Sequence, residues 1–237
     1  MSRMLLHGTA SSLELEAVAF LRLMQLASPA LPIGAFAYSQ GLEQAVEFGW
    51  VRDEASAADW IRGVLTEILP RLDVPALIAM HAAWSEHDAG RVRVLSQFLH
   101  ACRESAELGA EDRQLGAALA RVLDGLGIAE GAAWIADEDA TFVTSFALAA
   151  VRFQLPIAGT VLAFLFAWLE NQVAATTRLV PLGHIAAQRV LSQLLLELPN
   201  AAERGLALPW AEVGFLAPRL AIASALHESA YSRLFRS

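Results

Sequence analysis

The sequence of 237 residues contains no lysine, and all 17 of its basic residues are arginine. A Walker A phosphate loop, a Schiff-base enzyme and a protein kinase each depend on a lysine amine at a fixed place in the site. The absence of lysine therefore excludes these three kinds of site from the chain. Any nucleotide chemistry in which the protein takes part must be carried out by another protein.

Cysteine and basic clusters are also scarce. Cys102 is the single cysteine, which excludes an intrachain disulfide and fits a reducing cytoplasm. The first residues, MSRMLLHGTASS, lack the long apolar run and the small-residue cleavage site of a secretory signal. The net charge is −8 and there is no basic run, so we expect no nucleic-acid partner. These features together predict a cytoplasmic protein.

Charged residues make up only 18% of the chain, whereas hydrophobic residues make up 56%. Such a surplus points either to a membrane segment or to an extensive subunit interface. The strongest membrane candidate is the uncharged run LPIAGTVLAFLFAWL at residues 155–169. A helix of that length spans about 22 Å, which is less than the ~30 Å hydrocarbon layer. We therefore predict a fully buried central helix from Ile157 to about Thr176, and a membrane-associated helical adaptor stays open as an alternative.

The periodicity of apolar residues is helical throughout. No segment shows sustained two-residue alternation bounded by turns, and β-branched residues are sparse. We predict an all-α, compact, bundle-like protein without a sheet, in which residues 1–237 form a single domain and residues 1–12 are flexible. The expected helices cover residues 13–27, 40–48, 53–69, 73–84, 91–102, 111–126, 139–153, 157–176 and 184–198.

Several helix ends are predicted from single residues. Ser11 and Glu14 have the spacing of a capping box. Ser39 and Asp73 are each placed to cap the helix that follows. Pro199 is expected to stop the helix over residues 184–198, because proline cannot continue it.

Residues 26–43, LASPALPIGAFAYSQGLE, are the stretch around which the chain is organised. Pro29 and Pro32 favour extended backbone and end the preceding helix. Phe36 and Tyr38 place two aromatic rings in a loop of otherwise small residues. Two interpretations fit this pattern: a buried apolar connector, or a rigid aromatic loop that contacts a partner protein.

Patterns for catalysis and metal binding are weak. The six histidines include no i,i+4 pair, and the sequence has neither HExxH nor CxxC, so we predict no metal site. Ser39 in AYSQG lacks the glycine and the leading strand of a hydrolase nucleophile elbow. Glu107 and Glu111 could form a paired general acid and base only if they shared a helix face, and this requires one helix to continue past Gly109. We therefore expect no enzyme, no catalytic residue and no tightly bound cofactor, and a cofactor-free helical enzyme is kept as an alternative.

The tail, residues 228–237, combines apolar and arginine side chains: Tyr231, Arg233, Leu234, Phe235 and Arg236. Guanidinium groups suit carboxylates or carbonyl oxygens, and the apolar side chains would anchor beside them. Two interpretations are again open. A chain end of this composition either frays or folds back onto its own core, or it becomes ordered when a partner binds.

Three stretches of this sequence match the pattern of one protein family. They are residues 26–51, which extend the loop through EQAVEFGWV, residues 176–191 with TTRLVPLGH and AAQRVL, and residues 217–237, APRLAIASALHESAYSRLFRS. A weaker match is ESAELGAEDRQLG at residues 104–116. In this order they resemble the urease accessory protein UreF family over the whole chain apart from its first dozen residues. The chain departs from the family pattern at His184, where glutamine is usual, and at Ala221, where a charged residue is usual.

The resemblance implies an all-helical, dimeric accessory protein of urease maturation. Proteins of this family link the UreD/UreH accessory protein to the GTPase UreG, so that nickel and a carbamylated lysine are installed in apo-urease. The resemblance implies that nickel and GTP belong to partner proteins and that this chain recruits UreG and couples its nucleotide state to metal transfer. The implied partners are UreD/UreH, UreG, apo-urease and a second copy of this chain.

Two partner-binding surfaces follow from the same resemblance. The first surface consists of Phe36, Tyr38, Ser39 and Glu43. The second surface lies on the tail and is assigned to UreD/UreH; it consists of Tyr231, Arg233, Leu234, Phe235 and Arg236.

Overall fold

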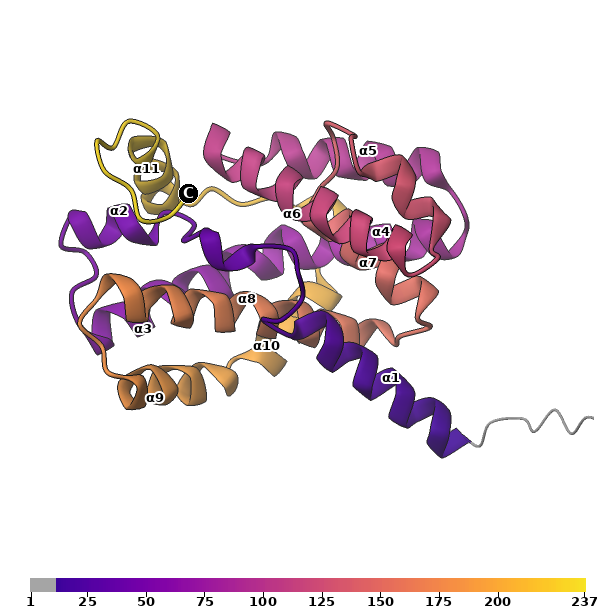
Figure 1. Ribbon diagram of the computed structural model, residues 1–237, viewed down its shortest axis with the longest axis horizontal. Helices are drawn as coiled ribbons and strands as arrows, with labels where there is room; N and C mark the ends of the chain where they lie inside the picture. Colours follow the sequence, from indigo (N-terminus) through magenta and orange to yellow (C-terminus); the bar gives the residue numbers. More distant parts are fainter. Residues whose placement is uncertain (1–11) are drawn as a thin grey trace, which may run out of the picture.

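The computed structural model describes residues 12–237, and this range contains eleven α-helices, five short helical turns and no β-strand (Figure 1). The α-helices are α1 (Ser12–Ala27), α2 (Leu42–Glu47), α3 (Glu54–Gly63), α4 (Asp73–Ser85), α5 (Ala89–Ala101), α6 (Ala106–Gly125), α7 (Phe142–Arg152), α8 (Ile157–Leu179), α9 (His184–Leu195), α10 (Leu198–Ala207) and α11 (Pro218–His227). The short turns are η1 (Ala35–Ala37), η2 (Val64–Ile68), η3 (Leu69–Arg71), η4 (Ala129–Trp134) and η5 (Trp210–Glu212). The all-α prediction is confirmed. The predictions for residues 1–11, including the cap at Ser11, lie outside the described range.

α8 lies at the centre of the fold and contacts α1, α4, α9 and α10. Val161, Leu165 and Leu169 are buried in the main apolar core. The predicted central position is confirmed, but the prediction of full burial is wrong, because Leu162 on another face is 38% exposed. By length and composition α8 could cross a membrane, and 44% of its most apolar window is buried within the fold. A core helix of a folded domain meets the same criterion of length and composition.

α6 begins five residues before the helix predicted over residues 111–126, and it continues through Gly109 and Gly116. These glycines are sites of close packing and do not end the helix. A Cβ atom added at Gly116 would lie 2.6 Å from the carbonyl oxygen of Thr141, so only glycine fits there. Because the helix is continuous, Glu107 and Glu111 lie four residues apart on the same face of α6.

Arg103 forms a buried ion-pair network in the connection between α5 and α6. Its Nη2 lies 2.7 Å from Oδ1 of Asp73, and its Nε lies 2.8 Å from Oδ2 of Asp112. Burial disfavours the charged guanidinium, but the two carboxylates outweigh this effect and raise the pKa of Arg103. Asp73 is therefore not the predicted cap. Leu72 holds the N-cap position of α4, and the Asp73 carboxylate joins this helix to the α5–α6 connection.

The helix predicted over residues 184–198 is divided in two. α9 ends at Leu195, and Pro199 lies in the first turn of α10, where its missing N–H leaves no helical hydrogen bond unmade. α10 packs against α4 through Gly205, because a Cβ atom added there would lie 2.8 Å from Cβ of Val74. The proline thus starts a second helix that helps to close the core.

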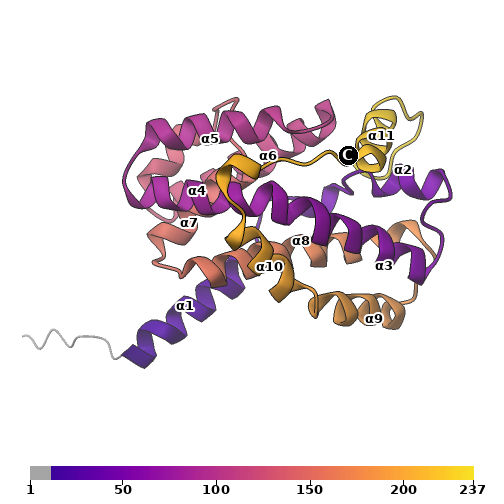
Figure 2. The same ribbon diagram turned by 180° about the vertical axis from the view of Figure 1, so that it is seen from behind.

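The segment between α10 and α11 crosses the back of the molecule, as Figure 2 shows. Along this path the ring of Trp210 packs against Phe98 of α5, with 5.3 Å between the ring centroids. The amide of Gly214 donates a hydrogen bond of 2.9 Å to the carbonyl oxygen of Arg71. The segment leads into α11, which packs against α2.

Candidate functional site

The two surfaces predicted from the sequence meet in the structure. The amide and Oγ of Ser39 donate hydrogen bonds of 2.9 and 2.5 Å to the carbonyl oxygen of Ser237. The amide of Arg236 donates one of 2.8 Å to the carbonyl oxygen of Ala37. In both Figure 1 and Figure 2 the C-terminus lies close to α2 and α11. The tail therefore folds back onto the loop that begins the chain's second helix.

The side chain of Glu43 binds backbone amides of the tail. Its Oε1 accepts a hydrogen bond of 2.7 Å from the amide of Leu234, and its Oε2 accepts one of 2.8 Å from the amide of Phe235. Glu43 lies in the first turn of α2 and is buried. Hydrogen bonds to an ionised carboxylate are stronger than those between neutral groups, so one side chain fixes two successive residues of the tail.

α6 contributes two further carboxylates. Oε1 and Oε2 of Glu107 lie 2.6 Å from Nη1 of Arg233 and 2.7 Å from Nδ1 of His227. One helical turn later, Oε2 of Glu111 accepts a hydrogen bond of 2.6 Å from Oγ of Ser237. His227 also lies 3.2 Å from Glu43 through its Nε2, so it connects α2 and α6 beneath the tail. We call Ala37, Ser39, Glu43 and Glu111 the tail cradle.

The ring of Phe235 is the apolar anchor of the tail. It is 3% exposed and belongs to a small apolar cluster with Leu42, Val51 and Val180. The guanidinium of Arg178 lies 4.4 Å from the centroid of this ring. The four stretches singled out in the sequence thus converge here, because Arg178 belongs to the stretch over residues 176–191 and Glu107 and Glu111 to the stretch over residues 104–116.

The start of α2 differs from the prediction. The helix begins at Leu42, and Gly41 holds its N-cap position with φ of 76°, so Ser39 is not the cap. The Oγ of Ser39 still accepts a hydrogen bond of 3.2 Å from the amide of Glu43. The serine that the sequence predicts as a local cap therefore bonds both the first turn of α2 and the far end of the chain.

The nine predicted partner-binding residues divide by exposure. Phe36 is 70% exposed, Leu234 is 52% exposed and Tyr231 is fully exposed, and Arg233 and Arg236 are exposed as well. The other four residues are buried: Tyr38, Ser39, Glu43 and Phe235. Tyr38 is buried, as a buried apolar connector would require, whereas Phe36 is exposed, as a loop that contacts a partner would require. In this arrangement the buried four hold the loop and the tail, and the exposed five are available for contact.

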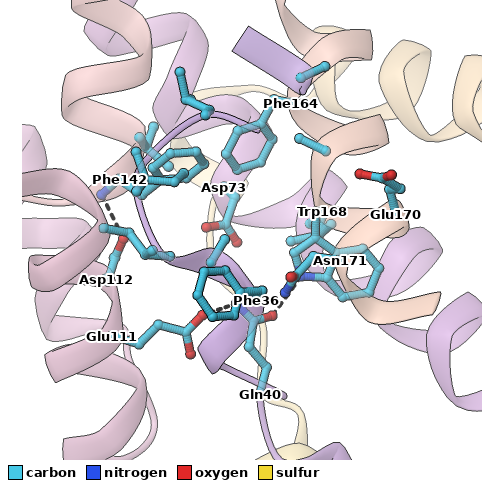
Figure 3. A pocket seen from close by; sticks show the side chains of 18 of the residues that line it. Phe36, Gln40, Asp73, Glu111, Asp112, Phe142, Phe164, Trp168, Glu170 and Asn171 are labelled. Carbon is cyan, nitrogen blue, oxygen red and sulfur yellow. Dashed lines mark hydrogen bonds between the residues drawn. The ribbon is translucent and has the colours of Figure 1, made fainter. Parts of the chain in front are cut away.

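A cavity of about 200 Å³ adjoins the tail cradle, between residues 26–36, α6 and α8 (Figure 3). Phe36 and Trp168 line it from the loop and from α8, and most of the other lining residues are aliphatic or aromatic. Gln40 accepts a hydrogen bond of 2.6 Å from Nε1 of Trp168 and donates one of 2.7 Å to Oε1 of Glu111. Gln40 thereby connects the wall of the cavity to the cradle.

Glu111 is the titratable group at this junction. Burial raises its pKa to about 7, against the hydrogen bonds from Ser237 and Gln40, which favour the ionised form. Both of its carboxyl oxygens are already bonded, so the geometry serves to hold the tail and not to transfer a proton to a substrate.

No cluster of three or more histidine, cysteine, aspartate or glutamate side chains within residues 12–237 is placed to hold a metal ion. The sequence patterns indicate Glu43 only as part of a contact surface, and they assign no role to Glu107, Glu111, Arg178 or His227. The four-residue spacing of Glu107 and Glu111 was the one local signal that could have indicated two of them.

The fold and the site define an all-α protein whose C-terminal segment docks beside an aromatic loop. The sequence model of the family described as UreF matches residues 51–195. The chain is 50% identical to the urease accessory protein UreF of Alkalilimnicola ehrlichii, over 91% of this chain and 95% of the relative. The corresponding identity is 49% for Marinobacter nauticus, over 93% and 95%, and 44% for Pseudoalteromonas translucida, over 98% and 100%. The chain belongs to the UreF family.

Proposed function

We propose that this chain is a urease accessory protein that links UreD/UreH to the GTPase UreG during GTP-dependent insertion of nickel into apo-urease and modulates UreG. The observation that supports the proposal is the identity, over nearly the full length, with relatives named urease accessory protein UreF. A chain without lysine suits an adaptor that leaves GTP hydrolysis to its partner. We further propose that it has no enzymatic activity, acts in the cytoplasm and forms a homodimer.

The exposed residues of the two surfaces support an adaptor role. Tyr231 and Leu234 offer apolar anchors, and Arg233 lies between them in sequence with its side chain 40% exposed. Aromatic and arginine side chains are enriched at the energetic centres of protein interfaces. We propose that these tail side chains contact UreD/UreH and that the loop around Phe36 contacts another partner.

Co-purification tests the proposal. The tagged chain is co-expressed with UreD/UreH, UreG and apo-urease and purified with and without GTP. We expect UreD/UreH to be retained in both preparations and the amount of UreG to depend on GTP. Loss of both accessory proteins from the purified chain would contradict the proposal. Sedimentation of the chain with lipid vesicles, or turnover of a substrate by the chain alone, would instead favour the two alternatives raised by the sequence.

A matched pair of variants tests the assignment of the tail surface. Tyr231→Ala removes a fully exposed ring from the tail, and Leu196→Ala removes a side chain that is 82% exposed at the end of α9. If Tyr231 is an anchor, its removal weakens capture of UreD/UreH by at least about 10-fold, as expected for a residue at the energetic centre of an interface. Leu196→Ala should leave capture unchanged. Equal binding by both variants would refute the role of Tyr231.

A further inference from the structure

The cavity between residues 26–36, α6 and α8 has the size and the lining of a site for a small molecule. Its volume is about 200 Å³, and an apolar cavity of about 150 Å³ is already large enough to hold one benzene molecule. The rings of Phe142 and Phe164 stack on one side, with 5.9 Å between their centroids, and Figure 3 shows the rings of Phe36 and Trp168 across from them. Such a lining suits an apolar body of about one aromatic ring.

Two irregular pieces of backbone form part of the cavity wall. Val64 and Ile68 line the cavity from η2, which is a π-helical turn that follows α3 directly. Gln40 also lines it, with φ of 54°, a conformation that is rare for residues other than glycine. The side chain of Gln40 is fixed by its hydrogen bonds to Trp168 and Glu111. Both kinds of departure from regular backbone are concentrated at functional sites, so they support a binding role for this cavity.

The charged side chains that line the cavity make its wall negative. Asp73 and Asp112 both pair with Arg103, so two carboxylates face a single guanidinium there. Glu111 is bonded through both of its carboxyl oxygens, to Gln40 and to the hydroxyl of Ser237. Since the only lining guanidinium is already paired twice, the wall favours a cation over an anion.

Glu170 is the lining carboxylate that has no partner of its own within residues 12–237. It lies on α8 and is half-buried. Burial raises the pKa of Glu170, because the ionised carboxylate loses water and gains no hydrogen bond or ion pair in return. A bound cation with N–H groups would supply a charge-assisted hydrogen bond to this carboxylate.

We propose that this cavity binds a small protonated amine with an apolar body of about one aromatic ring, and that the ammonium group of the ligand pairs with Glu170. The body of the ligand lies against the rings that line the cavity. An anion of the same size is rejected by the negative wall. The proposal rests on the cavity alone and does not depend on the urease partners.

Three probes of similar size and different charge test the proposal on the intact chain: phenethylamine is cationic, phenethyl alcohol is neutral and phenylacetate is anionic. Binding is followed by titration in NMR spectra of the isoleucine methyl groups. We expect phenethylamine to bind with a dissociation constant of about 1 mM or lower, at least about 10-fold more tightly than phenethyl alcohol, and phenylacetate not to bind. The methyl signals of Ile33 and Ile68 in the cavity wall should shift, whereas the signal of the exposed Ile185 on α9 should not.

A variant that fills the cavity assigns the binding to it. Ala167→Leu adds carbon atoms to the wall and should abolish binding of both phenethylamine and phenethyl alcohol. The thermal midpoint of this variant should not fall, because the added atoms enter empty space. Ala55→Leu makes the same change at an exposed position of α3 and should leave binding unchanged.

A second pair of variants tests the carboxylate. Glu170→Gln should weaken binding of phenethylamine at least about 10-fold, because the ammonium group loses its charged partner, and should change binding of phenethyl alcohol less than about 3-fold. Glu203→Gln removes an exposed carboxylate from α10 and should have no effect on either probe. If Ala167→Leu fails to fold, this pair and the methyl shifts decide the question.

Every other outcome overturns the proposal. Absence of phenethylamine binding refutes the site. Equal binding of the amine and the alcohol, or tighter binding of phenylacetate, refutes the pairing with Glu170. Amine binding that persists in folded Ala167→Leu, or that shifts Ile185 and not Ile33 and Ile68, places the ligand elsewhere. These measurements use this chain alone, so their failure would leave the proposed adaptor role standing.

Discussion

Glu111 makes the stability of this protein depend on pH in a predictable direction. This residue is 3% exposed, and burial raises its pKa to about 7 from a model-compound value of 4.5. Between these two pH values the folded protein keeps a proton that the unfolded chain has lost. The free energy of unfolding therefore falls as the pH rises from about 4.5 to about 7, because ionisation is disfavoured only in the folded state.

The magnitude follows from the pKa difference. Each pKa unit corresponds to about 1.4 kcal/mol, so a rise from 4.5 to about 7 corresponds to about 3 kcal/mol of stability lost across this window. Glu111→Gln removes the titration and keeps one oxygen that can accept a hydrogen bond from Ser237 or Gln40. The variant should therefore gain about 3 kcal/mol relative to the parent protein between pH 4.5 and pH 7.5, whatever constant offset the substitution introduces.

Urea denaturation followed by far-ultraviolet circular dichroism measures this difference. Unfolding curves of the parent and the Glu111→Gln variant are recorded at intervals from pH 4.5 to pH 8, and the free energies of unfolding are extrapolated to water. Glu47→Gln, an exposed carboxylate on α2, is the control for loss of one charge, and its difference from the parent should be nearly constant. Parallel curves for the parent and Glu111→Gln would refute the reasoning, because they would mean that Glu111 ionises in the folded and unfolded states alike.

Three further predictions concern packing, buried charge and partner contact. Gly205→Ala should lower the free energy of unfolding by roughly 1–3 kcal/mol, because the added methyl group would clash with Val74 of α4. Gly63→Ala, at a helical position with open space around it, should raise the free energy of unfolding by up to ~1 kcal/mol. Urea denaturation measures both changes. Arg103→Leu should lower the free energy of unfolding by at least about 3 kcal/mol in the same measurement, because two buried carboxylates lose their partner. Arg91→Ala should lower it by less than ~1 kcal/mol, because the ion pair of Arg91 is exposed. Arg233→Ala should weaken UreD/UreH binding by roughly 1–3 kcal/mol in isothermal titration calorimetry if its guanidinium is desolvated in the complex, and an unchanged dissociation constant would place Arg233 outside the interface.

The helical class and most of the helices could be predicted from the sequence because their signals are local. Asp53 and Ser56 form the capping box that starts α3, Thr141 caps α7, and Gly49 ends α2 with φ of 70°. Each of these features depends on residues within one helical turn. The run over residues 155–169 is likewise long enough for its apolar character to identify α8.

The errors arose where tertiary packing overrides a local signal. Gly109 is typical of a helix break, yet it lies inside α6, where the ring of His100 packs against the space that a side chain would fill. Asp73 looked like a cap, yet its carboxylate is bound by an arginine 30 positions away. Such pairings depend on the arrangement of other helices, and nothing in the neighbouring sequence encodes them.

The candidate site could be predicted only in part for the same reason. The loop and the tail were identified by composition, but composition cannot show that Glu43 accepts hydrogen bonds from residues more than 190 positions later. It also cannot separate an aromatic ring that faces outward, such as Phe36, from one that faces inward, such as Phe235. The contribution of α6 to this site became visible only once the helix was known to be continuous.

The spacing of the two glutamates on α6 restricts how this part of the chain can change in evolution. Glu107 and Glu111 contact different parts of the chain's last segment from one face of the same helix. Inserting or deleting a single residue between them would rotate one carboxylate by about 100° around the helix axis relative to the other. One set of contacts would then be lost whichever glutamate stayed in place. The interval from residue 107 to residue 111 must therefore keep its length.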